Sequence, residues 1–77
     1  MVQAFLELHL KTLALRLDDL LARDEGHVQA RFYRGCVHHR MGDVASAKRD
    51  FEGVLEREPS HAAASAKLSV LVGETVI

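Results

Sequence analysis

The chain repeats itself with a period of about 34 residues, and this internal similarity limits its fold more than any other feature of the sequence. When the sequence is shifted by one period, apolar residues fall on apolar residues and charged residues on charged ones. The matched pairs are Leu13 with Ala47, Leu17 with Phe51, Leu20 with Val54, Leu21 with Leu55, Arg23 with Arg57, Asp24 with Glu58, His27 with His61 and Ala30 with Ala64. Such a period indicates stacked structural units, each too small to bury its own apolar face.

The units have the residue spacing of helices, not of strands. Apolar residues recur every three or four positions, and turn-forming residues divide the chain into four segments. The dividing residues are Gly26, Gly42-Asp43 and Pro59-Ser60. We expect Gly26 to adopt a left-handed conformation after the first helix, Asp43 to cap the third and Ser60 to cap the fourth. The sequence therefore predicts an all-α fold of about four antiparallel helices.

The segment from Val28 to Ser60 resembles one complete tetratricopeptide repeat (TPR), a helix–turn–helix unit with this period. The residues that carry the resemblance are Ala30, Gly35, Gly42-Asp43, Ala47, Phe51, Leu55 and Pro59, with Val54 in place of the usual alanine. Within it, residues 46–56 are similar to the last repeat of large FKBP-type immunophilins and related co-chaperones. The resemblance implies one TPR-like domain over residues 1–77, made of the second helix of a preceding repeat (1–25), one full repeat (28–60) and a following or capping helix (61–77).

Three positions depart from the TPR pattern. Arg31, Arg34 and His38 stand where the pattern prefers an aromatic residue, a leucine and a tyrosine, so we expect looser or wetter packing there. Together with His27 they form a basic stripe that could bind a carboxylate or a phosphate through guanidinium contacts. Neutralisation of the stripe by acidic residues of the neighbouring segments is the interpretation that the balanced overall charge favours.

Both ends of the chain are more apolar than one buried face requires. Leu8 and Leu15 form a second apolar line on the first helix, and Val70 and Leu71 lie in a last segment with few charges. A terminal repeat that faces water normally has a polar outer surface. We therefore expect either a longer array that covers these faces or self-association into a homo-oligomer through Leu8, Leu15, Val70 and Leu71.

Composition narrows the range of partners. The formal net charge is −1, which gives no electrostatic reason to expect nucleic acid or an anionic membrane. No apolar run reaches the ~20 residues of a membrane span, and the start lacks the pattern of a secretory signal. The lone Cys36 cannot form a disulfide within the chain. We expect a cytoplasmic protein whose partner is another protein or a peptide.

The sequence offers little for catalysis or metal binding. Cys36 and His39 stand three residues apart on one helix and could share a metal ion, but no further ligands follow at a recognisable spacing. A packed thiol beside surface imidazoles is the favoured interpretation. The chain has no glycine-rich phosphate loop and no clear nucleophile with a base and an orienting group. We expect no enzyme, no metal and no cofactor.

The resemblance to co-chaperones makes one further point about partners. It implies a clamp in which a lysine and an arginine of the last repeat's first helix grip the C-terminal carboxylate of a heat-shock chaperone. Those positions are Gln29 and Tyr33 here, and neither supplies a cation. A groove contact through Gln29, Phe32, Tyr33 and Cys36 remains as the candidate partner-binding site, unless Phe32 belongs to the core.

The leading prediction is thus a non-enzymatic protein–protein interaction module or scaffold of TPR type. One alternative is a chaperone C-terminal-peptide receptor of immunophilin type. The other is a metal- or redox-responsive protein that uses Cys36 and His39.

Overall fold

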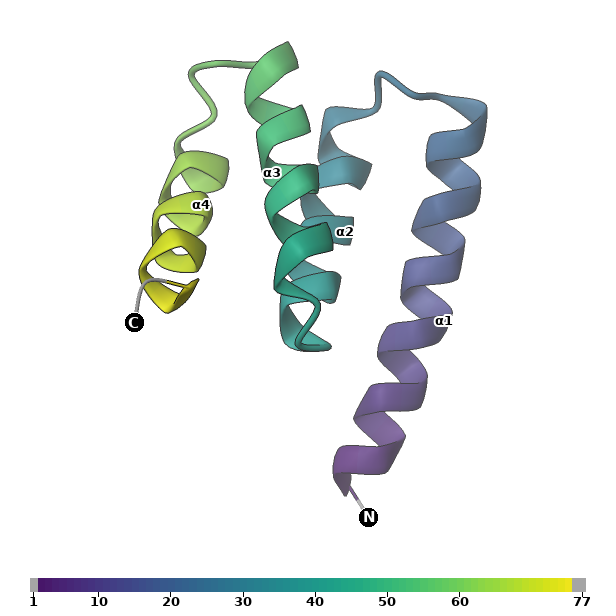
Figure 1. The fold of residues 1–77 in the computed structure, drawn as a ribbon. Helices are drawn as coiled ribbons and strands as arrows, with labels where there is room; N and C mark the ends of the chain where they lie inside the picture. The colour runs from purple at the N-terminus through teal and green to yellow at the C-terminus, as the bar shows by residue number, and fades with distance from the viewer. Residues whose placement is uncertain (1, 76–77) are drawn as a thin grey trace.

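The computed structural model consists of four helices, α1 (Val2–Arg23), α2 (Val28–Arg40), α3 (Val44–Arg57) and α4 (Ala62–Thr75). It describes the backbone of residues 2–75 and the side chains of residues 9–73. The helices stand side by side in the order of the chain, and each runs antiparallel to the one before it (Figure 1). The molecule is a flat stack of 39 × 38 × 16 Å. These observations confirm the predicted all-α helical stack.

Local capping contacts determine where three of the helices begin. The backbone amides of Ala30 and Ala64 each donate to a histidine ring, at Nδ1 of His27 and Nδ1 of His61, over 3.0 Å in both cases. Asp43 caps α3 as expected, because its Oδ1 accepts from the backbone amide of Ser46 over 3.2 Å. The expectation that Ser60 caps the fourth helix was wrong, since the adjacent imidazole accepts that hydrogen bond.

The left-handed turn residue is not the predicted one. Within the described chain, Gly42 has φ of +83° and is the only residue with a positive φ. Gly26 was expected to adopt this conformation, but its turn closes in another way: its backbone amide donates to Oδ1 of Asp24 over 3.2 Å. Gly42 ends α2, and the carbonyl groups of the last turn of α2 accept from the amides of residues 41–43.

The two turns that are one period apart have the same hydrogen bonds. The amide of Asp24 donates to the carbonyl of Leu20 over 2.9 Å, and that of Glu58 to Val54 over 2.8 Å. His27 then donates to Asp24 over 3.1 Å, as His61 donates to Glu58 over 3.0 Å. The sequence repeat is therefore also a repeat of backbone geometry, from the end of one helix through the cap of the next.

The core lies where α4 covers α2 and α3. Ala47, Phe51 and Leu71 are fully buried, and four half-buried residues pack against them. These are Phe32 and Cys36 from α2, Val44 from α3 and Leu68 from α4. The Phe32 ring lies between Phe51 and His61, at centroid distances of 5.6 and 5.0 Å. None of the helices in the described part of the chain has both the length and the apolar character needed to cross a bilayer.

Candidate functional site

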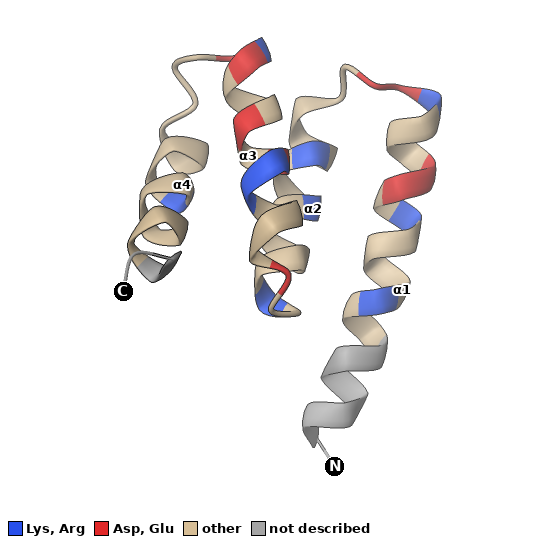
Figure 2. Cartoon of the chain, viewed as in Figure 1, with Lys and Arg blue, Asp and Glu red and all other residues tan. Residues whose placement is uncertain are grey.

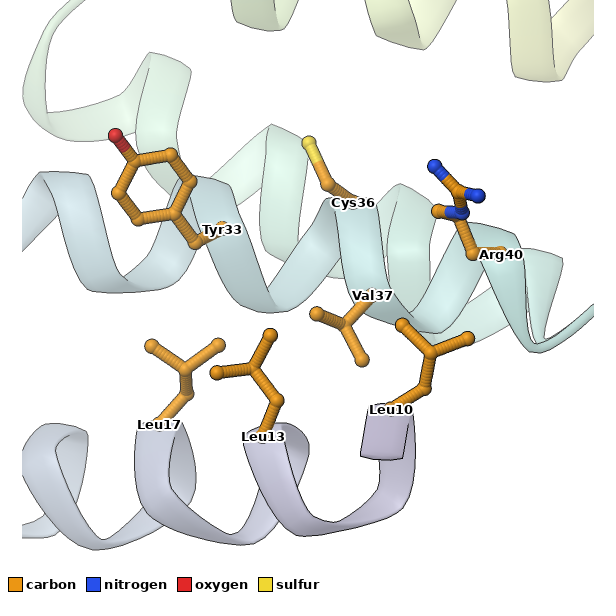
Figure 3. A pocket seen from close by; sticks show the side chains of 7 residues that line it. All are labelled: Leu10, Leu13, Leu17, Tyr33, Cys36, Val37 and Arg40. Atoms are coloured by element: carbon orange, nitrogen blue, oxygen red, sulfur yellow. The ribbon is translucent and has the colours of Figure 1, made fainter. Parts of the chain in front are cut away.

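An apolar groove of about 480 Å³ runs between α1 and α2. We call it the α1–α2 groove and define it by its lining residues, Leu10, Leu13, Leu17, Tyr33, Cys36, Val37 and Arg40. The three leucines point from α1 toward α2, and Val37 points back toward them (Figure 3). Tyr33, Cys36 and Arg40 form the α2 rim, so one guanidinium lies beside a wall that is otherwise mostly apolar.

Helical spacing explains why the groove exists. Leu10, Leu13 and Leu17 lie three and four residues apart, which puts them on one face of α1. The buried contacts of α1 with α2 are made by a neighbouring face that carries Ala14 and Leu21. Leu13 therefore remains 40% exposed, and Tyr33 on the opposite rim is 49% exposed. Two adjacent helices thus present apolar side chains that neither of them covers.

The four predicted partner-binding residues have different environments. Gln29 and Tyr33 are exposed, and Nε2 of Gln29 donates to the Tyr33 hydroxyl over 2.9 Å. Cys36 is half-buried in the groove, and burial raises the pKa of its thiol. Phe32 packs against the core cluster and does not line the groove. The structure therefore brings Tyr33 and Cys36 together at the groove, keeps Gln29 at its edge and assigns Phe32 to the core.

The residues predicted to mediate self-association do not form one surface. Leu15 and Val70 are exposed by 69% and 51%, but they belong to the first and last helices of the stack. Leu71 is fully buried, which corrects the expectation that it is available to a partner. It follows Val70 by about 100° around the helix, and this rotation turns its side chain inward onto α3. Leu8 lies outside the residues whose side chains are described.

The expected loose packing at Arg34 is replaced by an ion-pair network that the sequence analysis missed. The Nε and Nη2 of Arg34 donate to both carboxylate oxygens of Asp50, over 2.7–3.2 Å. Its Nη1 donates to Oδ1 of Asp18 on α1 over 2.9 Å. The hydrogen bonds to Asp50 raise the pKa of Arg34. Asp50 is only 3% exposed. The sequence could have indicated this burial, because Asp50 lies on the same helical face as Ala47 and Val54.

Arg31 and His38, two other members of the basic stripe, are only partly satisfied, because Nε of Arg31 and Nδ1 of His38 are buried without a hydrogen-bond partner. Arg31 lies over Gly53, and its Nη2 donates to the backbone carbonyl of Glu25 over 2.9 Å. The His38 ring nitrogens lie 3.8 Å from Asp50 and 3.9 Å from Asp43, which are ion-pair distances too long for hydrogen bonds. Neutralisation by acidic residues of neighbouring helices, the favoured interpretation, is what the structure shows for Arg34.

The alternative based on Cys36 and His39 gains no geometric support. Among the described residues, no group of three or more histidine, cysteine or acidic side chains is arranged to hold a metal ion. A thiol whose pKa is raised by burial is also protonated at neutral pH, whereas metal binding and thiol exchange use the thiolate.

Comparison with known proteins finds relatives that match over most of this chain. No model of a protein family matches, and no solved structure matches. An FK506-binding protein-like protein of Mus musculus is 34% identical over 64 residues, which are 83% of this chain and 18% of that protein. An FK506-binding protein-like protein of Rattus norvegicus is 33% identical over the same shares. The chain spans 18% of the length of these curated relatives, and over that part it is similar to FK506-binding protein-like proteins.

Proposed function

We propose that the chain is a non-enzymatic protein–protein interaction module of TPR type. The observation that carries the proposal is the α1–α2 groove, a hollow of about 480 Å³ with three leucines on one wall and Tyr33 on the other. Grooves of this kind between helices receive an amphipathic helix or an extended peptide, with apolar side chains as anchors. No catalytic role is proposed, because the residues that line the groove bring no base near the protonated Cys36 thiol.

The TPR assignment is supported by the paired turns. The histidine cap, the hydrogen bond from its backbone amide and the hydrogen bond that ends the preceding helix recur one period later with nearly equal lengths. In this scheme residues 28–60 form one repeat, residues 1–25 supply the second helix of the repeat before it, and residues 61–77 follow or cap it. The lone thiol of Cys36 fits a reducing compartment, so we propose a cytoplasmic module.

Similarity to FK506-binding protein-like proteins favours a second candidate, a receptor for chaperone C-terminal peptides. We propose that this chain does not use a cationic clamp for such a peptide. Gln29 and Tyr33 occupy the clamp positions implied by the resemblance, and they are hydrogen-bonded to each other. Titration with an acidic C-terminal pentapeptide, followed by calorimetry, should show no saturable binding. Saturable binding that is lost when the terminal carboxylate is amidated would support the receptor instead.

The main proposal can be tested without knowing the partner. A displayed library of random 16-residue peptides is selected on the 77-residue chain, and the dissociation constants of the selected peptides are measured. The test variant is Leu13→Asp, which puts a charge on the groove wall. The control is Leu15→Asp, which makes the same change two residues away, outside the groove.

A groove-directed binder should lose about tenfold or more in affinity with Leu13→Asp, the effect of one anchor contact. The same binder should be little affected by Leu15→Asp. Helix content and thermal midpoint are compared first, so that lost affinity is not confused with unfolding. A library that yields no binder, or binders equally sensitive to both variants, would contradict the proposal.

A further inference from the structure

The α1 residues that line the groove have counterparts on α3, one period later in the sequence. On α3 these counterparts are covered by another helix. A shift of one period carries four of the seven groove residues, the three leucines of α1 and Val37 of α2, onto residues of the core cluster. The pairs are Leu10 with Val44, Leu13 with Ala47, Leu17 with Phe51 and Val37 with Leu71. The turns between these helices also share their backbone hydrogen bonds, so the two walls occupy corresponding places in the repeat. The groove is thus a docking surface whose occupied version is visible in the same molecule.

The wall formed by the core cluster is covered by helix α2. Phe32 and Cys36, four residues apart, pack on the cluster of Ala47, Phe51 and Leu71. Between them Gly35 approaches Phe51 so closely that a Cβ would lie 2.7 Å from the ring. The occupant of the α1–α2 groove should therefore be a helix that is antiparallel to α1 and has apolar residues at positions i and i+4. Leu17 is smaller than Phe51, so a small residue other than glycine fits at i+3.

The charges beside the two walls differ in sign. On α3 the wall is flanked by Asp43 and Asp50, which face His38 and Arg34 of α2. The equivalent residues of α1 are His9 and Arg16, and they line a second hollow of about 260 Å³ with Leu13. Along α1, Lys11 and Arg16 precede the acidic pair at 18–19 (Figure 2), and of these two basic residues Arg16 is the one that lies beside Leu13.

We propose that the α1–α2 groove binds an amphipathic helix that is acidic where α2 is basic. Numbered from its first anchor, this helix has apolar residues at i and i+4 and carboxylates at i+2 and i+6. The carboxylate at i+2 reaches Arg16, as Arg34 reaches Asp50 within the chain. Electrostatic complementarity of this kind selects the partner more than it raises affinity. The inference rests on the proposed function and adds the chemistry of the partner.

A second copy of this chain fits the groove less well. Its α4 is equivalent to α2 in the repeat, and α4 has Leu68 and Val72 at the positions of Arg34 and His38. Neither supplies a carboxylate to Arg16. The single acidic residue of α4, Glu74, is at the position of Arg40 and not at that of Arg34 or His38, and Lys67 adds a positive charge. The basic residue beside the wall therefore favours an acidic helix over α4 of a second copy.

The probe is a peptide derived from α2, which is known in this structure to fit such a wall. It comprises residues 27–41 with Arg34→Glu and His38→Glu, and with Gly35→Ala and Cys36→Ala to raise helix content and remove its thiol. The matched control peptide carries the last two changes alone and keeps the basic charges. Both are titrated at low salt into the 77-residue chain, and the dissociation constants are compared.

Two protein variants test whether the preference for the acidic peptide depends on Arg16. Arg16→Glu reverses the charge on the wall, and Lys48→Glu makes the same change in net charge on the exposed side of α3. Cys36 provides a separate readout, because it is the single thiol of the chain and lines the groove. Bound peptide should slow its alkylation by iodoacetamide.

We expect the acidic peptide to bind about tenfold more tightly than the basic control, a difference of about 1.4 kcal/mol. Arg16→Glu should reverse this preference, whereas Lys48→Glu should leave it in place, and only the tighter peptide should protect Cys36. Equal binding of both peptides, no binding of either, or a preference unchanged by Arg16→Glu would overturn the inference. A concentration-dependent molar mass that Leu13→Asp abolishes would overturn it too, because a second copy would then occupy the groove.

These outcomes are distinct from the test of the proposed function. Library peptides that are sensitive to Leu13→Asp but show no acidic preference would refute the acidic partner and leave the interaction module intact. A library without any groove-directed binder would contradict both the acidic partner and the interaction module.

Discussion

Replacement of Gly35 by alanine tests the closest approach in the structure. Gly35 is buried in α2, and a Cβ built on it would lie 2.7 Å from one Phe51 ring carbon and 3.0 Å from two others. Phe51 is fully buried, and its ring contacts that of Phe32 at 5.6 Å, so it has no free space to enter. Accommodating the methyl group therefore requires α2 and α3 to move apart.

Two opposing effects set the size of the change. Alanine is favoured over glycine in a helix interior by about 1 kcal/mol. Overpacking a rigid core costs about 1–3 kcal/mol, and a contact this short places the cost in the upper half of that range. We therefore expect Gly35→Ala to lower the free energy of unfolding by about 1–2 kcal/mol, or to lower the Tm by roughly 4–16 °C in a domain of this size.

The matched control is Gly73→Ala in α4, where a Cβ would meet nothing within 4 Å. Only the helix-propensity effect applies there, so this variant should gain up to about 1 kcal/mol. Urea unfolding followed by circular dichroism measures both variants on one scale. If Gly35→Ala proved as stable as Gly73→Ala, the close approach of α2 and α3 would be refuted.

Three further predictions concern polar contacts, and urea unfolding checks each of them. His27→Ala should cost about 1 kcal/mol through loss of a helix cap, and His61→Ala should cost about 0.5–1.5 kcal/mol more because its ring also stacks near an aromatic core residue; equal costs would contradict the ring contact. Asp50→Ala should lower the free energy of unfolding by roughly 2 kcal/mol. This is less than the about 3–5 kcal/mol expected for a fully buried ion pair, because its partner Arg34 is partly exposed. Asp18→Ala removes the exposed end of the network and should lower it by under about 1 kcal/mol. The hydrogen bonds from Ser46 lower the pKa of Asp43. The Asp43 carboxylate therefore stabilises the fold at pH values above the ordinary aspartate pKa, and this stability is lost as the pH falls through the lower folded-state pKa. Asp43→Asn should keep the cap and make stability less dependent on pH below about pH 4, and an unchanged pH dependence there would show that Asp43 contributes nothing.

The parts of the fold that the sequence predicted are those determined by local contacts. Helix existence and the Asp43 cap depend on residues within one turn of each other, so spacing alone indicated them. Two local predictions were wrong. His61 replaced Ser60 as a cap because an imidazole nitrogen accepts a hydrogen bond as a hydroxyl oxygen does. Gly42, not Gly26, took the left-handed conformation.

Contacts between helices were harder to predict because they depend on residues far apart in sequence. Arg34 was noted as an unusual residue at an apolar position, but its partner Asp50 lies 16 residues away on another helix. Only a comparison of buried faces across the stack would have paired them. Phe32 shows the same difficulty, since its ring turns toward the core while Tyr33, one residue later, faces the groove rim.

The two repeat units share the contacts that form their turns, but they differ in the residues on their surfaces. The backbone hydrogen bonds of the turns and the histidine caps are the same in both copies. The walls themselves differ: Ala47 is fully buried beneath its neighbours, whereas the equivalent Leu13 is 40% exposed. Substitution at Ala47 must therefore change stability, but substitution at Leu13 can change recognition while the fold persists. A surface that can vary without loss of the fold, on a wall already shaped to accept a helix, is what an interaction module requires.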